Sequence, residues 1–265
     1  INPSMTYEFA ISFLTPHRIV AEKVKAKKKI AWIHTDYTRV WVDAEDELKV
    51  WQKYDYVASI SGDVTNTFLQ VFPSLAPKIV EIENILSPTF VRKRAEIQDV
   101  DKEIRHEGAI TLLSVGRFSD AKNYDNVPDI CKRLINETKL NIKWYIIGYG
   151  GDEALIRKKI KEAGMEEHVI LLGKRSNPYP YIKACDIYVQ PSRYEGKSVT
   201  VREAQMLCKP VVVTNYPTAP SQIRSGIDGV IVPMDNEGCA HGLAEVICDK
   251  SFQERIIAHL KTHDY

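Results

Sequence analysis

The chain has 265 residues, of which 44% are hydrophobic and 27% charged, which is ordinary for an α/β protein and argues against a disordered or collagen-like chain. Its 36 basic and 35 acidic side chains leave a formal net charge of +1, so the overall field gives no reason to expect a nucleic-acid partner. Five scattered cysteines without a C-x-x-C pair predict reduced thiols in the cytoplasm. No apolar run approaches the roughly 20 residues that cross a bilayer, and we see no signal peptide.

Residues 1–85 alternate short apolar runs with helix-like stretches. The runs EFAISFL, KIAWIH, YVASIS and KIVEI are typical of strands, and a basic stretch after the first run is a helix candidate. DAEDELKVWQKY and residues 62–72 are further helix candidates, and the acidic run from Asp43 to Glu47 is read as the solvated face of the former. We interpret residues 1–85 as part of an N-terminal Rossmann-like domain. Residues 86–108 are polar and charged with a proline, which predicts an interdomain linker.

Residues 109–250 carry a stronger alternation. Six β-rich runs (ITLLSV, KWYIIG, VILLG, DIYVQPS, PVVVT and GVIVP) are separated by amphipathic stretches, the pattern of parallel strands joined by helices. The last stretch, from Asn236 to Lys261, is read as helical, and residues 251–265 are assigned to a C-terminal helix that packs back toward the first domain. This α/β pattern predicts a doubly wound sheet, in which ligands bind outside the carboxyl ends of the strands.

The loop after DIYVQPS holds the strongest signal for a binding site. Gly196 permits a tight turn, and Ser198 is a candidate N-cap, so the backbone N–H groups of the next helix would point at a phosphate. Glu195 and Glu203 would face the same cleft and accept hydrogen bonds from sugar or ribose hydroxyls, unless they are ordinary solvent-facing carboxylates. A P-loop is excluded because Pro191 occupies the position of a required glycine.

A second polar loop follows ITLLSV. Arg117 offers a planar fork for two phosphate oxygens, and Lys122 adds a point charge, so together they would hold a diphosphate. The alternative is that both are solvated loop cations. GYGG at 148–151 resembles a dinucleotide fingerprint only weakly, because the third required glycine falls at Glu153.

These blocks together resemble the family 4 glycosyltransferases, a large retaining group with the two-domain GT-B fold. The resemblance covers about residues 109–250 in the expected order. It rests on the following stretches: Gly116-Arg117 with Lys122-Asn123, IIGYG, LLGKRSNPYPYIKACDIYVQPSRYEG, the Glu-x7-Glu pair of Glu195 and Glu203, and CKPVVVTN followed by GIDGVIV.

The resemblance implies a role for each matching residue. Arg117 and Lys122 would neutralise the donor diphosphate and act with Glu195, which would contact the transferred sugar, and with His34 of KIAWIHTDY, which would reach that sugar from the first, acceptor-side domain. His34 is alternatively a structural histidine. Other residues implied at the donor site are Gly116, Gly148, Lys174, Arg175, Gly196, Lys197, Ser198, Val199 and Glu203, of which Glu203 would bind the ribose and Lys174 and Arg175 would line the base pocket.

The implied activity is a retaining hexosyltransferase that uses a nucleoside diphosphate sugar, with UDP-sugar as the first expectation and GDP-sugar as the second. The acceptor would be a saccharide or a lipid-linked saccharide of polysaccharide or glycoconjugate synthesis, and neither metal nor cofactor is expected. The Gly-rich segment with which family members usually begin is not matched, so the N-terminal domain is expected to be incomplete, and Gln222 stands where a Glu is usual.

Three alternatives stay open at the level of sequence. A glycoside hydrolase also uses two carboxylates, but it does not need Arg117 and Lys122. A non-catalytic nucleotide-sugar binding module, or an inactive fragment, would bind the donor without turnover. Finally, the basic stretches Lys23–Lys29 and Arg92–Arg94 would either touch an anionic membrane surface at the inner face of the membrane or be ordinary solvated charges.

Overall fold

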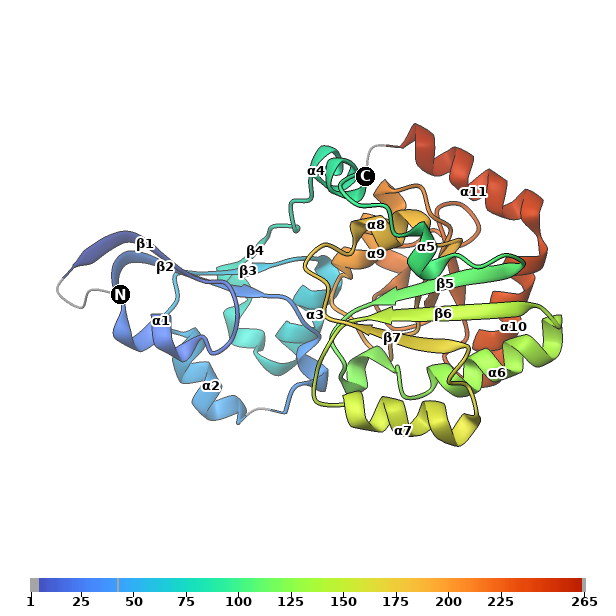
Figure 1. Ribbon diagram of the computed structural model, residues 1–265. Helices are drawn as coiled ribbons and strands as arrows, with labels where there is room; N and C mark the ends of the chain where they lie inside the picture. The colour runs from blue at the N-terminus through green and yellow to red at the C-terminus, as the bar shows by residue number, and fades with distance from the viewer. Residues whose placement is uncertain (1–4, 42, 264–265) are drawn as a thin grey trace. The chain divides into compact units, whose positions relative to one another are not determined.

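The computed structural model describes residues 5–41 and 43–263. Contacts divide the chain into two compact units, Ile1–Ile85 and Leu86–Tyr265. Each unit contains one parallel sheet (Figure 1). The two sheets differ in how they are covered, and each unit is therefore described by itself.

The first unit holds a four-stranded parallel sheet in the order β1-β2-β3-β4. One buried cluster joins this sheet to the three helices of the unit through residues such as Val57, Trp51 and Phe68. The short helices η1 and η2 complete the unit. The elements are β1 (Thr6–Ser12), α1 (Arg18–Lys23), β2 (Lys25–Ile33), η1 (Tyr37–Arg39), α2 (Ala44–Trp51), β3 (Tyr56–Ser59), α3 (Gly62–Val71), η2 (Pro73–Lys78) and β4 (Ile79–Glu81).

The starts of α2 and α3 follow from their capping residues. The Asp43 side chain accepts hydrogen bonds from the first-turn amides of α2, so the acidic run does begin a helix with an exposed acidic face. Ser61 caps α3 in the same way by accepting from the Val64 amide. Both helices therefore begin where the sequence predicts them.

The basic stretch after β1 is a correction to the sequence interpretation. Its helix, α1, already ends at Lys23, and the lysines from Lys25 onward belong to strand β2. Lys27 pairs with Glu8 at 2.6 Å and Lys28 pairs with Asp55 at 3.1 Å. These strand lysines keep their charges at the surface, which an extended backbone permits as readily as a helix does.

The second unit holds a six-stranded parallel sheet in the order β10-β9-β8-β5-β6-β7, which confirms the predicted doubly wound sheet. The chain order reverses where β5 lies between β6 and β8, so the loops that follow β5 and β8 are neighbours. The strands are β5 (Ala109–Val115), β6 (Asn141–Ile147), β7 (Val169–Gly173), β8 (Ile187–Gln190), β9 (Val211–Thr214) and β10 (Val230–Val232).

Helices cover both faces of this second sheet (Figure 1). Trp144 and Ile146 belong to a buried cluster with α6, α7 and α10, whereas Tyr145 and Ile147 of the same strand belong to a second cluster with α5, α8 and α9. The sequence of such a strand is a continuous apolar run, because successive side chains point to opposite faces of the sheet and both faces are buried. The helices are α6 (Val127–Thr138), α7 (Glu153–Ala163), α8 (Tyr179–Ala184), α9 (Val199–Met206) and α10 (Asn236–Cys248).

Residues 86–108 differ from the polar linker that the sequence indicates. They form α4 (Pro88–Ala95) and α5 (Asp101–Ile104) and belong to the second unit. Val91 and Ile104 are buried, and the Arg92 Nε donates to the Met206 carbonyl at 3.2 Å. A few apolar residues at helical spacing are enough to pack each of these short helices, and charged side chains occupy the solvent-facing side of the helix. The segment therefore resembles a polar linker in sequence.

The stretch from Asn236 onward forms two helices, and the second of them is the predicted C-terminal helix. Asp249 leaves the helical conformation after α10 and caps α11 (Lys250–Thr262) by accepting from the Phe252 amide. Ile256 and Leu260 are buried, and α11 contacts α10. Its packing toward the first unit stays a prediction.

The five cysteines are free thiols, as their spacing predicts. Three of them (Cys131, Cys185 and Cys239) are buried, and burial raises the pKa of each to about 12. None of the helices in residues 5–41 and 43–263 is both long and apolar enough to cross a membrane.

Candidate functional site

The loops after β5 and β8 are tied together by Arg193. Its backbone amide donates to the Ala121 carbonyl at 2.8 Å, and its guanidinium binds both Asp125 oxygens, at 3.0 and 2.8 Å. Such a two-pronged pair fixes direction as well as distance. The guanidinium also donates to the Asp120 carbonyl at 2.6 Å. No role is predicted for Arg193 from the sequence, and its position two residues before Glu195 is the signal that would have suggested one.

The same two loops bring Lys122 and Glu195 into contact. The Lys122 Nζ lies 2.5 Å from the Glu195 Oε1, and the two side chains are only 18% and 12% exposed. The sequence predicts that both residues belong to one site, and the geometry joins them directly. At this depth the ion pair is screened by solvent much less than a surface pair is.

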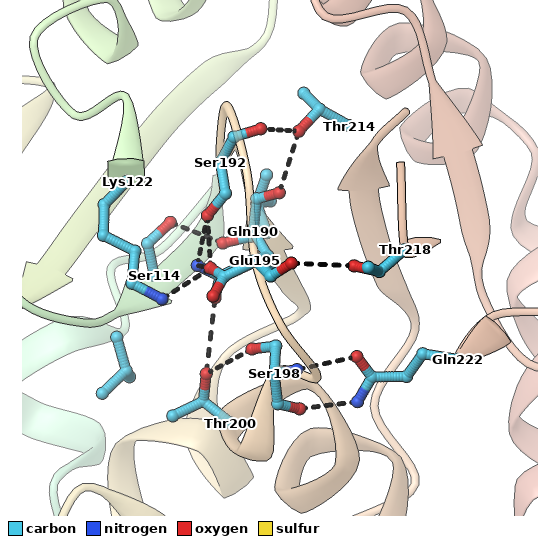
Figure 2. Close-up of polar contacts among 12 residues, drawn as sticks. Ser114, Lys122, Gln190, Ser192, Glu195, Ser198, Thr200, Thr214, Thr218 and Gln222 are labelled. Atoms are coloured by element: carbon cyan, nitrogen blue, oxygen red, sulfur yellow. Dashed lines mark hydrogen bonds and ion pairs between the residues drawn. The ribbon is translucent and has the colours of Figure 1, made fainter. Parts of the chain in front are cut away.

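Two neutral donors from the end of β8 bind the same carboxylate oxygen (Figure 2). The Ser192 hydroxyl donates to the Glu195 Oε1 at 2.6 Å, and the Gln190 Nε2 donates to it at 3.0 Å. Both donor residues are fully buried. Sequence reasoning missed them, although polar residues at the end of an apolar strand are a usable signal, because a buried amide or hydroxyl needs a partner.

The main chain of this loop is also held. The Thr214 hydroxyl at the end of β9 donates to the Ser192 carbonyl at 2.5 Å, and the Thr218 hydroxyl donates to the Glu195 carbonyl at 3.1 Å (Figure 2). Glu195 is therefore fixed through both its side chain and its backbone. A carboxylate prepared in this way loses little freedom when it binds a ligand.

The N-terminus of α9 differs in detail from the prediction. Ser198 occupies the N-cap, but its side chain makes no capping hydrogen bond. The Gln222 carboxamide instead accepts from the Ser198 amide at 3.0 Å and donates to the Ser198 carbonyl at 2.6 Å (Figure 2). The Ser198 N–H is thus occupied, so Val199 at the first helical position is the nearest helix amide to offer a phosphate. An ionised Glu at 222 would lack the N–H that donates to Ser198.

Glu203 lies one and a half turns into α9 and is 7% exposed. Burial raises the pKa of this carboxyl, while the hydrogen bond from the Tyr179 hydroxyl, 2.8 Å away, opposes that rise. Burial, together with the Glu203 charge, raises the Tyr179 pKa to about 12. Tyr179 is another residue to which the sequence interpretation gave no role, and it holds Glu203 separately from the Glu195 cluster of Lys122, Gln190, Ser192 and Glu195.

Gly148 allows the loops after β5 and β6 to approach each other, and Gly116 allows close packing within the loop after β5. A Cβ on Gly148 would lie 1.9 Å from the Gly116 carbonyl oxygen, so no side chain fits there. A Cβ on Gly116 would lie 2.8 Å from the Tyr124 hydroxyl and 3.0 Å from the Lys122 Cε. Close backbone approach therefore explains the glycine at position 148, and a part of either glycine in donor binding stays a prediction. Gly196 is buried in the loop before α9, and Lys197 next to it is partly exposed.

The predicted basic residues do not all meet. Arg117 is exposed, and within residues 5–41 and 43–263 we find no hydrogen bond or ion pair for its guanidinium. The Lys174 Nζ lies 5.0 Å from the centre of the Tyr149 ring. Arg175 is engaged away from the Glu195 cluster, because it pairs with Glu103 of α5 at 2.9 Å and donates to the Tyr181 hydroxyl. A base pocket formed by Lys174 and Arg175 stays a prediction.

His34 lies in the first unit, directly after β2. Its ring centre is 4.5 Å from that of Phe13, and its Nε2 is buried with no hydrogen-bond partner in the described part of the chain. Burial lowers its pKa. A neutral imidazole results, and the contact of His34 with a donor sugar stays a prediction.

Comparison with known proteins identifies the family. The family model described as "Glycosyl transferases group 1" matches residues 96–262, which is more than half of the chain and includes the β8–α9 loop. An N-acetylgalactosaminyltransferase of Campylobacter jejuni, named for an undecaprenol-diphosphate-linked acceptor, is 30% identical over 153 residues, 57% of this chain and 41% of that protein. The amylovoran biosynthesis glycosyltransferase AmsD of Erwinia amylovora is 24% identical over 196 residues, 68% of this chain and 55% of AmsD.

Solved structures agree on the fold. Anabaena Alr3699/HepE, crystallised in complex with UDP-glucose, superposes with a TM-score of 0.76 at 16% identity, over 88% of this chain and 66% of that one. The matched segments span about half the length of the two curated relatives named above. The predicted GT-B fold class is thereby confirmed, and the chain belongs to the glycosyl transferases group 1 family.

Proposed function

We propose that this chain is the donor-binding part of a retaining, family 4 type glycosyltransferase that moves a hexose-type sugar from a nucleoside diphosphate sugar to an acceptor hydroxyl. The observation that carries the proposal is the meeting of Lys122 and Glu195 where the strand order of the second sheet reverses. Ligands of doubly wound sheets bind at that reversal. UDP is the first choice of nucleotide, because Anabaena HepE is similar in fold and was crystallised with UDP-glucose, and GDP is the second.

The difficult step is the departure of the diphosphate, on which negative charge accumulates. Arg117 and Lys122 would bind its oxygens, and the first-turn amides of α9 would add further donors. Glu203 would accept from the ribose hydroxyls, and Glu195 would accept from hydroxyls of the transferred sugar. With these groups in place we expect neither a metal ion nor a cofactor to be needed. Charge stabilisation in a partly buried site is worth more than in water, because the donors are already oriented.

The acceptor proposal is a saccharide or a lipid-linked saccharide, because relatives are named for an undecaprenol-linked acceptor and for amylovoran biosynthesis. We expect the reaction to take place in the cytoplasm, with peripheral contact at the inner face of the membrane. A non-catalytic donor-binding module is the second candidate, since the family match covers residues 96–262, which include the donor-site loops of the second unit. It would bind the donor and release no nucleoside diphosphate when an acceptor is supplied.

A thermal-shift panel of UDP- and GDP-sugars tests the proposal. We expect one nucleotide sugar to raise the melting temperature most, and we expect Arg117→Ala and Glu203→Ala each to abolish that rise. Arg157→Ala is the matched control, because Arg157 pairs with Glu153 on the exposed face of α7. An unchanged ligand response in both site variants would remove the site assignment.

A further inference from the structure

The Glu195 carboxylate accepts hydrogen bonds from more donors than the ion pair with Lys122 alone provides. Its Oε1 accepts from the Lys122 ammonium at 2.5 Å, from Ser192 at 2.6 Å and from Gln190 at 3.0 Å (Figure 2). Only the ammonium carries a charge and sits on a long, flexible stem. The two neutral donors belong to the end of β8 and are fully buried. The carboxylate is thus bound by one mobile and two fixed donors.

The two fixed donors are themselves oriented by the structure. The side-chain oxygen Oε1 of Gln190 accepts from the Tyr188 hydroxyl at 2.8 Å and lies 3.4 Å from the Thr200 hydroxyl. The side-chain nitrogen Nε2 must therefore face Glu195. The same nitrogen donates to the Ser192 oxygen at 2.8 Å, which directs the Ser192 proton to the carboxylate. Neither donor needs to rearrange if the ammonium moves away.

Two negatively charged groups compete for the Lys122 ammonium. It pairs with Glu195 in this structure, and the proposed function places it on the donor diphosphate. Leaving a mostly buried carboxylate without donors is costly, so an ammonium that was its sole partner would move only at a large energetic cost. The hydrogen bonds from Gln190 and Ser192 reduce that cost.

We propose that Lys122 is shared between Glu195 and the diphosphate, and that Gln190 and Ser192 are positioning residues that hold the Glu195 carboxylate when Lys122 turns to the diphosphate. The inference rests on the proposed function, since it requires a diphosphate at this site. It adds that Glu195 competes with the diphosphate for the ammonium. The negative charge of Glu195 therefore weakens diphosphate binding, although Glu195 belongs to the donor site.

Calorimetric titration of the full chain with inorganic pyrophosphate, which has neither base nor sugar, tests this competition. Glu195→Gln keeps the shape of the side chain and removes its charge, so we expect pyrophosphate to bind about fivefold more tightly. Ser192→Ala leaves the carboxylate more dependent on Lys122, so we expect binding about fivefold weaker. In the Glu195→Gln background, Ser192→Ala should have no effect on pyrophosphate affinity.

The outcomes separate the inference from the proposed function. If Lys122→Met weakens binding but Glu195→Gln does not tighten it, the competition is wrong and the diphosphate site stands. If Ser192→Ala weakens binding equally in both backgrounds, its role is merely structural and the positioning claim is overturned. If wild-type chain does not bind pyrophosphate, or Lys122→Met leaves binding unchanged, the diphosphate site itself is rejected and the inference with it. Gln190→Met provides a second variant, with thermal melting as the check on folding.

Discussion

The two sheets bury their side chains in different ways. In the second unit, β8 and β9 are buried along their whole length, and separate cores lie on the two faces of the sheet. In the first unit, Ala10 and Ser12 of β1 are buried, whereas Phe9 and Ile11 are 64% and 52% exposed. The helices of the first unit pack in one buried cluster with residues of β2 and β3. The site network of Gln190, Ser192 and Glu195 therefore lies beside strands that are buried along their whole length, where hydrogen bonds to a carboxylate are strengthened by the low dielectric.

A matched pair of isoleucines tests this difference most strongly. Ile146 of β6 is fully buried, so Ile146→Ala should lower the free energy of unfolding by about 2–5 kcal/mol. Ile11 of β1 is half exposed, so Ile11→Ala should change it by about 0.5 kcal/mol or less. Urea denaturation measures both. Equal losses would show that the two sheets are covered alike.

A pair of arginines tests whether nucleotide binding depends on the second unit alone. Arg193→Lys keeps the charge but loses the two-pronged grip on Asp125, so the loops after β5 and β8 should loosen and UDP affinity should fall about tenfold. Arg18→Lys is the control, because Arg18 pairs with Glu22 and Asp46 at the surface of the first unit. Calorimetric titration with UDP gives both affinities, and a similar fall in the control would contradict the assignment.

The two units should also respond to pH in opposite directions. Burial lowers the His17 pKa from 6.5 to about 4, and repulsion between His17 and His34 when both rings are protonated adds to that effect. Unfolded His17 therefore takes up a proton before the folded residue does, and the first unit loses stability as the pH falls from 6.5 toward 4. The raised Glu203 pKa has the reverse effect, because folded Glu203 keeps its proton longer, so the second unit loses stability as the pH rises from 4.5 through that raised pKa.

Hydrogen exchange measured by mass spectrometry at several pH values resolves the two units. His17→Asn should reduce the loss of protection in the first unit at acidic pH. Glu203→Gln should increase protection in the second unit at neutral pH, while the thermal shift with nucleotide sugar disappears. Variants that leave both pH profiles unchanged would show that these two side chains do not control them.

The smallest expected effect concerns the two basic stretches. Lys27 and Lys28 are paired with acidic residues, and the Arg92 Nε donates to the Met206 carbonyl, so these three side chains are less available to a lipid headgroup. Replacing Arg92, Lys93 and Arg94 by Gln should lower sedimentation with anionic liposomes by about twofold, and replacing Lys25, Lys27 and Lys28 should have a similar effect. No change in either variant would reject the membrane contact.

The predicted part of the site is the part that lies close together in sequence or directly after a strand. Glu195, Gly196 and Ser198 follow one apolar run, and Lys122 follows another, so the rule for doubly wound sheets brings them to one edge. Arg193, Tyr179 and Gln222 were missed as partners, because each acts across 24 or more residues of sequence, on Asp125, Glu203 and Ser198. Nothing in a local pattern specifies such a pairing.

The sequence by itself determined the second sheet. Six continuous apolar runs separated by amphipathic stretches bury their side chains best as parallel strands with helices on both faces of the sheet. The sequence also placed Lys122 and Glu195 in loops that follow strands, whereas the strand order that makes the loops after β5 and β8 neighbours came from the tertiary structure. Only the tertiary structure decided that residues 86–108 pack as helices on the second unit, that Gln222 clamps Ser198, and that Lys122 is paired with Glu195. These outcomes depend on which polar groups are buried together, and a buried polar group takes whatever partner the packed chain places within hydrogen-bond distance.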